Sequence, residues 1–281
     1  MDEDESEIEL ANVQGKYVGA GYYKDLISYS EDITDSYEDQ IANLREQLEL
    51  VDDDSAEYYR LLGQIEDCEA AIADCTIRQA EWNETIERLP IERIQTYITL
   101  LQHTIEDLDN FTSNQSQIGL SPTKEQYQTY IDLYTDQINE LLKKQEKLVE
   151  MQKKYDYGSE KYKEYADEIQ GIDNEISGLI NKQLEYNDAI LHIPINEMSK
   201  QYDNIAGARE ALDREIAEDN AKGLKTTIDQ YKQLNGITVQ QLQLLTAQRQ
   251  ALVGLLSVYD EDSEKYKEVQ SQIAGIDSTM S

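Results

Sequence analysis

The chain has 281 residues, of which 25 are Lys or Arg and 58 are Asp or Glu, giving a formal net charge of -33 at pH 7. A surface this acidic repels phosphate backbones and anionic lipid headgroups, so we expect no direct nucleic-acid binding and no membrane contact. No apolar run approaches the roughly 20 residues that span a bilayer, and the acidic start Met1–Glu5 is unlike a signal peptide. Three prolines, one Phe, one Trp and twenty Tyr favour long, solvated helices over a compact globular core.

A repeat of 104 residues organises the sequence, because a shift of that length aligns the chain with itself without a gap. The aligned landmarks are turn and core residues, which indicates that an architecture repeats rather than a binding motif. They include Ser55, Ser159 and Ser263; Pro90 and Pro194; Gly15, Gly119 and Gly223; Tyr23, Tyr127 and Tyr231; and Leu44, Leu148 and Leu252. We therefore expect a partial first unit at 1–90, a complete unit at 91–193 and a truncated third unit at 194–281.

Three helical segments are expected in each copy, and the second copy shows them at 123–154, 159–192 and 195–217. Their apolar residues step alternately by three and four, which is the seam pattern of helices that pack side by side. Strands would need a period of two residues, and no such run is present.

Burial can be predicted residue by residue along this seam. In the middle segment we expect Ile172 and Ile176 to be buried, whereas Lys161 and Glu164 should lie on the surface. The residues at the same register in the other copies should also be buried; they are Cys68, Ile72, Ile276 and Met280.

The breaks between segments contain residues that begin or end helices. Short loops rich in Asp and Ser separate the first two segments; both residues are good N-caps, and Gly158 suits a left-handed turn. These loops lie at 51–55, 155–159 and 258–263. Connections this short predict antiparallel neighbours. Only Pro90 or Pro194 separates the second segment from the third, so that junction is either a kink in one long helix or a tight break.

The expected fold is all-α, with tandem, elongated, antiparallel three-helix bundles held together by heptad seams. Short loops reverse the direction of the chain, whereas a segment that continues through proline carries it into the next bundle. The complete unit at 91–193 would then be one up-down-up bundle. In repeat length and in end-to-end chaining this architecture resembles spectrin-type repeats, although the order of the helices and the proline junction differ.

No catalytic, cofactor-binding or metal-binding residues are predicted, and neither a cofactor nor enzymatic activity is expected. His103 and His192 lie far apart in the sequence and lack metal-ligand spacing. The acidic loops at 52–54 and 260–262 lack the alternating ligands of a calcium loop, so helix capping is the stronger interpretation. No glycine-rich phosphate loop or nucleophile elbow is present.

Several polar and aromatic residues fall on the seams. Gln79 and Gln183 occupy equivalent positions, where each could bond across a bundle or lie at a partly exposed edge. Arg209 and Arg249 can extend past apolar neighbours to water. The two cysteines are seven residues apart, about 10 Å along a helix, which is too far for a disulfide. We expect four of these residues in the core: Cys68, Cys75, Trp82 and Tyr186.

The sequence around the two proline junctions, Glu84–Gln95 and Ala189–Met198, resembles the helical repeat regions of tail tape measure proteins from tailed phages and prophages of Gram-positive bacteria. The resemblance implies a structural segment that sets tail length during assembly. It also implies synthesis in the bacterial cytoplasm, location in the virion, and partners that include other copies of the chain and proteins of the tail tube or tail assembly.

Two other functions fit the same pattern. A helical rod could act as a bacterial spacer or scaffold, working through its length and side-chain docking. An adhesin or immune-interacting helical module would instead need an exposed apolar or aromatic patch. A tape measure segment would lie in a very long protein encoded among tail genes, a spacer would have anchoring segments, and an adhesin would bind a purified partner saturably.

Overall fold

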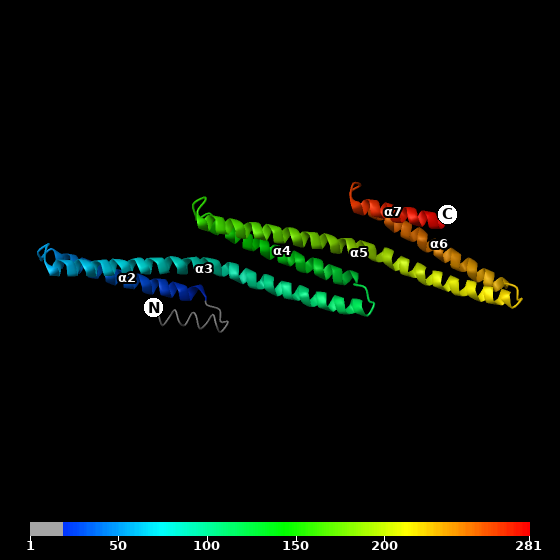
Figure 1. Ribbon diagram of the computed structural model, residues 1–281, viewed down its shortest axis with the longest axis horizontal. Coiled ribbons are helices and arrows are strands. Elements are labelled where there is room, and N and C mark those ends of the chain that lie inside the picture. The colour runs from blue at the N-terminus through cyan, green and yellow to red at the C-terminus, as the bar shows by residue number, and fades with distance from the viewer. Residues whose placement is uncertain (1–18) are drawn as a thin grey trace. The chain divides into compact units, whose positions relative to one another are not determined.

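The computed structural model describes residues 19–281, so Met1–Glu5 and the predicted landmark Gly15 lie outside the described part. Of the described residues 87% lie in six helices and none lies in a strand, which confirms the all-α prediction (Figure 1). The helices are α2 (Ala20–Leu48), α3 (Ala56–Gln117), α4 (Lys124–Gln152), α5 (Glu160–Ala221), α6 (Ile228–Leu256) and α7 (Glu264–Met280). Within residues 19–281 no helix is both long enough and apolar enough to cross a membrane.

The helix boundaries themselves repeat. Helices α2, α4 and α6 each contain 29 residues, and α3 and α5 each contain 62. Adding 104 to the first and last residue numbers of α2, α3 or α4 gives those of α4, α5 or α6. The period found in the sequence is therefore also the period of the secondary structure, because the residues that begin and end the helices recur with it.

Local hydrogen bonds explain where the helices begin. The hydroxyl oxygens of Ser55, Ser159 and Ser263 accept from backbone N–H groups three residues later, at 3.1, 3.2 and 3.1 Å. These bonds satisfy one of the unpaired N–H groups in the first turn of α3, α5 and α7. A capping box in which Thr227 and Gln230 satisfy each other's backbone N–H groups starts α6. The left-handed turn residue expected at Gly158 is present, with φ at 88°.

The proline junctions are continuous helix. Segments expected at 159–192 and 195–217 form a single helix, α5, which contains Pro194 and extends to Ala221. Likewise α3 contains Pro90. Of the two alternatives that the sequence left open, the tight break is therefore wrong. Proline has no N–H to donate to the carbonyl four residues earlier, and both prolines lie on exposed positions of their helices.

The buried side of each long helix changes at its proline. Most buried residues in α3 recur every seven positions, at Leu61, Cys68, Cys75, Trp82 and Leu89, and then again at Ile91, Ile98 and Ile105. Ile65 and Leu101 are buried between members of these two series. The step from Leu89 to Ile91 is only two residues, or about 200° around an α-helix. Before Pro90 and after it, α3 therefore buries nearly opposite faces.

Only one of the two predicted seam positions is fully buried. Ile172 is buried, as are its copies Cys68 and Ile276, which confirms the prediction for that position. Ile176 is half-buried, so its predicted full burial is wrong. The copies of Ile176 are half-buried too; they are Ile72 and Met280. The second heptad position lies nearer the flank of the helix contact, so its burial varies along the helix. Ile65, seven residues before Ile72, is buried.

The chain forms two compact units, and helices α3, α4 and α5 each contribute to both. Of the described residues, the first unit comprises 19–102 and 139–173, and the second comprises 103–138 and 174–281. The boundaries expected at residues 90 and 193 stay a prediction.

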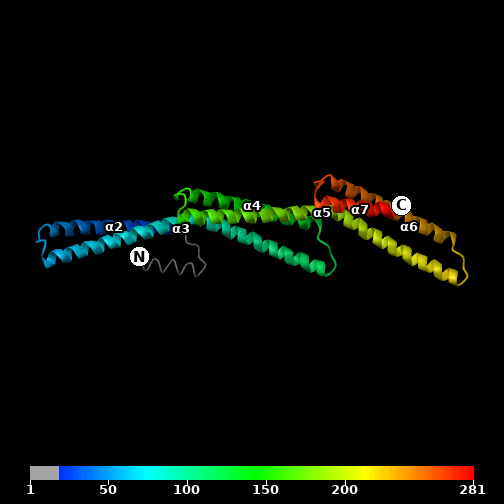
Figure 2. The same cartoon turned by 45° about the horizontal axis from the view of Figure 1, so that its top comes forward.

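Within the first unit, α2 lies beside the first part of α3, as both views show (Figure 2). Two apolar clusters join these helices: Tyr23, Leu26, Trp82 and Leu89 form one, and Ile41, Ile65 and Cys68 form the other. The burial predicted for Trp82 is thus confirmed.

Within the second unit, one apolar cluster takes residues from α5, α6 and α7. Its buried members are Ile195, Leu245, Leu252, Leu255, Val269 and Ile276.

Helices joined by the short acidic loops are antiparallel neighbours, as predicted. Near the α4–α5 loop, the Gln152 side chain donates to the backbone oxygen of Tyr162 at 3.1 Å. Farther from the loop, Gln145 donates to Asp173 at 2.6 Å. With distance from the loop, the residue numbers of the bonded pairs fall in α4 and rise in α5, so the two helices run antiparallel.

Candidate functional site at the helix prolines

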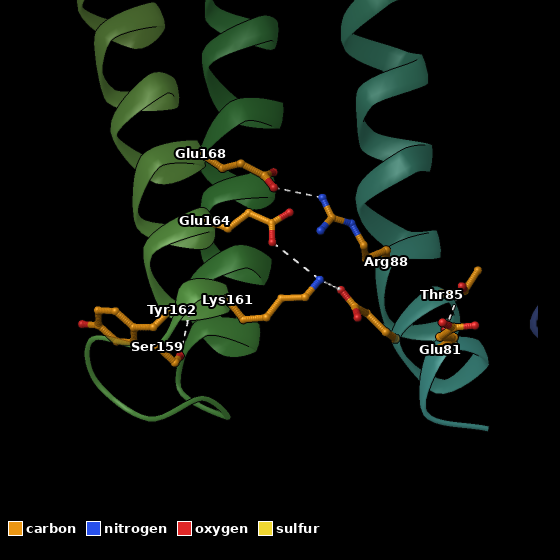
Figure 3. A network of polar contacts seen from close by, with 9 residues as sticks. Glu81, Thr85, Arg88, Ser159, Lys161, Tyr162, Glu164 and Glu168 are labelled. Carbon is orange, nitrogen blue, oxygen red and sulfur yellow. Dashed lines mark hydrogen bonds and ion pairs between the residues drawn. The ribbon is translucent and has the colours of Figure 1, made fainter. Parts of the chain in front are cut away.

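A network of ion pairs surrounds the helix turn before Pro90. Lys161 of α5 lies 2.6 Å from Glu84 of α3, and Arg88 of α3 lies 2.9 Å from Glu168 of α5 (Figure 3). Lys154, in the α4–α5 loop, pairs with Glu87. We call these six residues the first proline junction. From the pair Glu84–Lys161 to the pair Arg88–Glu168 the residue numbers rise in both α3 and α5, so these two helices run parallel here.

An aromatic core lies beneath this network. Tyr165 is fully buried, and the guanidinium carbon of Arg88 lies 5.6 Å from the centre of its ring. Burial raises the pKa of the Tyr165 phenol to about 12. Burial works against the charge of Arg88, but the hydrogen bond and the charge of Glu168 outweigh it and raise the guanidinium pKa. The hydrogen bond to Glu84 raises the pKa of Lys161. All these groups therefore keep their usual charges near neutral pH.

A second proline junction occurs one repeat later, before Pro194. Lys265 of α7 lies 2.9 Å from Asp188 of α5, and Tyr259 also bonds to Asp188. Lys265 and Asp188 are the residues 104 positions after Lys161 and Glu84, so the ion pair itself repeats. Burial alone would raise the pKa of Asp188, but hydrogen bonds from Tyr259 and Lys265 outweigh burial and lower it.

Two further contacts between helices repeat with the same period. The Lys144 ammonium lies 2.7 Å from the Gln95 side chain, and one repeat later Gln248 donates to Ser199 at 2.7 Å. Gln145 donates to Asp173 at 2.6 Å, and one repeat later Arg249 and Asp277 form a two-pronged ion pair, with its shorter contact at 2.6 Å. In each case the chemistry changes while the register is kept. Polar pairs at fixed register can align neighbouring helices along their length.

Buried and half-buried glutamines add cross-helix bonds. Gln79 donates to Ser30 at 3.0 Å, and Gln183 donates to Thr135 at 2.7 Å. Both glutamines are half-buried, so each combines the cross-helix bond and the edge position that the sequence offered as alternatives. Sequence reasoning missed a more deeply buried pair, Gln137 and Gln241. Their exact spacing of one repeat was the signal that could have found them.

Tyrosines cluster where the N-terminal half of α4 meets α5. The ring centre of Tyr186 lies 4.7 Å from that of Tyr130, 5.6 Å from Tyr127 and 5.9 Å from Tyr134. The hydroxyls of Tyr130 and Thr112 lie 3.2 Å apart. Tyr186, predicted to be in the core, is half-buried, because an edge of this shared aromatic stack faces water.

The remaining residues singled out in the sequence lie apart from the proline junctions or play small parts in them. Cys68 and Cys75 are free and buried, as predicted. His103 is exposed and lies 3.4 Å from Glu106, whereas a ring nitrogen of His192 lies 2.9 Å from the backbone oxygen of Asp188. Arg209 is exposed, and its guanidinium lies 3.3 Å from the Gln241 side chain. Arg249 is half-buried in its ion pair, so both seam arginines keep access to water.

The acidic loops serve as helix starts. In the loop before α7, the backbone oxygen of Asp260 accepts from the N–H of Ser263 at 2.9 Å, and the hydroxyl of Ser263 caps the helix. The same bond joins Asp52 to Ser55 before α3. Among residues 19–281 no group of three or more His, Cys, Asp or Glu side chains is placed to hold a metal ion. The absence of metal, cofactor and catalytic residues stays a prediction.

Sequence reasoning placed Lys161 on the surface and did not single out Arg88 or Asp188. In the structure Lys161 is half-buried and paired across helices, because its neighbour helix brings Glu84 to the same level. The recurrence of Lys161 as Lys265 was visible in the sequence, but its partner on another helix was not. The whole arrangement of ion pairs and polar contacts can hold helices in register.

Neither the known protein families, nor the curated proteins, nor the solved structures contain a match to this chain.

Proposed function

We propose that this chain is a helical-repeat segment of a phage tail tape measure protein and that it sets tail length during assembly. The observation that carries the proposal is that the helix boundaries and the polar contacts between helices recur together every 104 residues. A ruler needs equal increments along the chain, and such a repeat supplies them. The resemblance of the sequence around Pro90 and Pro194 to tape measure repeats supports the same assignment.

The proposed architecture is a tandem series of antiparallel three-helix bundles, spectrin-like in the way they are chained. The complete bundle would combine the part of α3 after Pro90, all of α4, and the part of α5 before Pro194. Support comes from the opposite buried faces before and after Pro90, and from the cluster that unites residues of α5, α6 and α7. Each long helix would then belong to two successive bundles.

The proposed role is structural and needs neither catalysis nor a cofactor. Its partners would be other copies of the chain and proteins of the tail tube or tail assembly. The chain would be made in the bacterial cytoplasm and end up in the virion. Its net charge of -33 favours protein partners over nucleic acid or anionic membrane.

Removing one repeat from a phage that encodes this chain tests the proposal. Deletion of residues 91–194 joins Pro90 to Ile195 and keeps the register of the long helix. Drawn out as one α-helix, a repeat spans about 156 Å, so tails measured by electron microscopy should shorten by about that length. If the bundled form were the ruler, the decrease would be only about 40 Å, because Lys161 lies beside Glu84, whereas its equivalent one repeat earlier, Glu57, lies 27 residues before Glu84 on the parallel helix α3. Duplication of the same residues is the matched control and should lengthen tails equally.

A spacer rod is the second candidate, and the helix caps and junction ion pairs favour it because they stabilise the bundled form. Tails of unchanged length after both the deletion and the duplication would reject the ruler and leave the spacer. In the tape measure proposal the bundle is a compact form that tail assembly draws out, with the apolar seams then pairing between parallel copies of the chain.

A further inference from the structure

The ends of the three helix hairpins, where each turns at its short loop, differ in charge. The second hairpin end, residues 143–163, has seven lysines and four acidic residues, which gives a net charge of +3. The first hairpin end, residues 39–59, has one arginine and seven acidic residues, which gives -6. The third, residues 247–267, has three basic and four acidic residues, which gives -1. Since these stretches lie one repeat apart and fold alike, the fold itself does not require the change of sign.

Charge reverses at individual positions while the helix cap is kept. Ser159 aligns with Ser55, and the hydroxyl of each caps a helix. Three lysines of the second hairpin end align with carboxylates of the first. The aligned pairs are Lys143 and Asp39, Lys153 and Glu49, and Lys161 and Glu57. The two ends therefore present surfaces of opposite charge, and such complementarity sets partner choice at protein interfaces.

Several of these charges have no partner within the fold. Lys153 and Lys163 of the second hairpin end are exposed and form no ion pair within residues 19–281. The three aspartates at 52–54 in the first hairpin end are likewise exposed and form no ion pair in that part of the chain. Both ends belong to the same compact unit and stay uncovered in the same copy, so they do not neutralise each other.

Each of the two hairpin ends also exposes a large apolar side chain. Tyr157 is 90% exposed and Leu50 is 85% exposed, the two highest values among the large apolar side chains of residues 19–281. The ring of Tyr157 packs edge-on against that of Tyr162, with the ring centres 5.1 Å apart, so the fold holds one side of it. Covering Tyr157 and Leu50 would remove apolar surface from water, which favours association.

We propose that copies of this chain associate through these surfaces, with the second hairpin end of one copy bound to the first hairpin end of another. Lys153 and Lys163 face the aspartates at 52–54 of the other copy, and Tyr157 and Leu50 cover each other. The contact joins two different surfaces, so each copy can bind one neighbour at each end and the association is open-ended. The proposal does not depend on a role in phage tails.

The net charge of -33 opposes any association of two copies, but the repulsion acts mostly over long distances. At an ionic strength of about 0.15 M, exposed charges separated by more than about 8 Å are largely screened. Charges that meet within the contact are closer than this and keep their attraction. Local complementarity between the hairpin ends therefore outweighs the average charge of the chain.

Sedimentation velocity of the full chain over a series of concentrations, at about 0.15 M salt, tests the proposal. The average mass should rise with concentration. Changing Lys153→Glu together with Lys163→Glu should weaken association by about tenfold or more, because two attractions become repulsions. The matched control, Lys222→Glu with Lys225→Glu, makes the same change in net charge at two exposed lysines of the α5–α6 loop. It should leave the association unchanged.

A charge swap identifies the other half of the contact. Glu49→Lys with Asp53→Lys makes the chain less acidic, yet it should also weaken association by about tenfold or more, because lysines then meet lysines. Mixing this variant with the Lys153→Glu, Lys163→Glu variant should restore association, since the reversed end of each fits the reversed end of the other.

An apolar pair of variants tests the centre of the contact. Tyr157→Ser should weaken association, whereas Tyr231→Ser, at a tyrosine of α6 that is 62% exposed, should not. Circular dichroism checks that the helix content of every variant is unchanged.

An original chain that stays monomeric up to about 1 mM would overturn the proposal. So would equal losses in the lysine variant and its matched control, or a mixture of the two charge-reversed variants that does not associate. Association that Tyr231→Ser weakens as much as Tyr157→Ser would place the contact elsewhere and overturn the proposal as well.

Discussion

The two proline junctions occupy the same place in successive repeats but are built differently. The first spreads its charge over three ion pairs, between Lys161 and Glu84, Arg88 and Glu168, and Lys154 and Glu87. The second gathers its contacts on one carboxylate, Asp188, which receives both Lys265 and Tyr259. Under the first lies Tyr165, and at the same position under the second lies Val269.

This difference teaches that the repeat preserves where helices are joined and not which side chains join them. In the first junction Lys161 has a second acceptor, Glu164 at 3.5 Å, so removing one partner leaves another. In the second junction two donors share Asp188. The first network should therefore tolerate single substitutions better, while its apolar core should matter more than that of the second.

The largest expected effect separates the two cores. Tyr165→Ala removes a fully buried ring and should lower the free energy of unfolding by about 3–5 kcal/mol, as for other buried aromatic residues. Val269→Ala at the equivalent position should lower it by about 1.5–3 kcal/mol, because less apolar surface is lost. Denaturant titration followed by circular dichroism measures both values. Equal losses would mean that the two junctions do not differ in their cores.

Substitutions of single carboxylates should have the next largest effect. Asp188→Asn weakens two contacts at a mostly buried carboxylate and should lower the free energy of unfolding by about 1.5–3 kcal/mol. Glu84→Gln should lower it by about 1 kcal/mol or less, because Lys161 can turn to Glu164. The same titration measures both variants. A larger loss for Glu84→Gln would reverse the comparison.

The second junction should also respond to acid. The pKa of Asp188 lies below its ordinary value of 3.8 in the folded chain, so its ionised form stabilises the fold above that value. This stabilisation is lost as the pH falls through the lower, folded pKa. Between about pH 5 and about pH 3, unfolding measurements should show a smaller loss of stability for Asp188→Asn than for the original chain. Tyr259→Phe, which removes one of the donors, should fall between them.

Removal of a helix cap should have the same effect at both junctions. Ser159→Ala and Ser263→Ala each remove a helix cap of the same geometry, with bonds of 3.2 and 3.1 Å. Each should lower the free energy of unfolding by about 1 kcal/mol. Glu160→Ala serves as an exposed control next to the first cap and should change the free energy of unfolding by less than about 0.5 kcal/mol. Unequal cap effects would show that the loops, too, have diverged between copies.

Much of the local structure could be predicted from the sequence alone. The 104-residue period, the loops before Ser55, Ser159 and Ser263, and the burial of Ile172 and Trp82 all follow from patterns along the chain. Capping is a contact over three residues and a seam is a rotation of 100° per residue, so both are properties of a short stretch. The assignment of Tyr23, Tyr127 and Tyr231 to equivalent positions was equally visible.

Only the tertiary structure decided how those elements are used. The helices α3 and α5 continue through Pro90 and Pro194, since packing before and after a proline can compensate for one lost backbone hydrogen bond. Ile176 is half-buried although its pattern equals that of Ile172, because burial depends on the position of a second helix. The partners of Arg88, Lys161 and Asp188 lie on other helices, and no spacing within one helix specifies them. Tyr127 and Tyr231 share a sequence position and differ in burial for the same reason: the ring centre of Tyr127 lies 5.6 Å from that of Tyr186 in α5, whereas the side chain of Tyr231 is exposed.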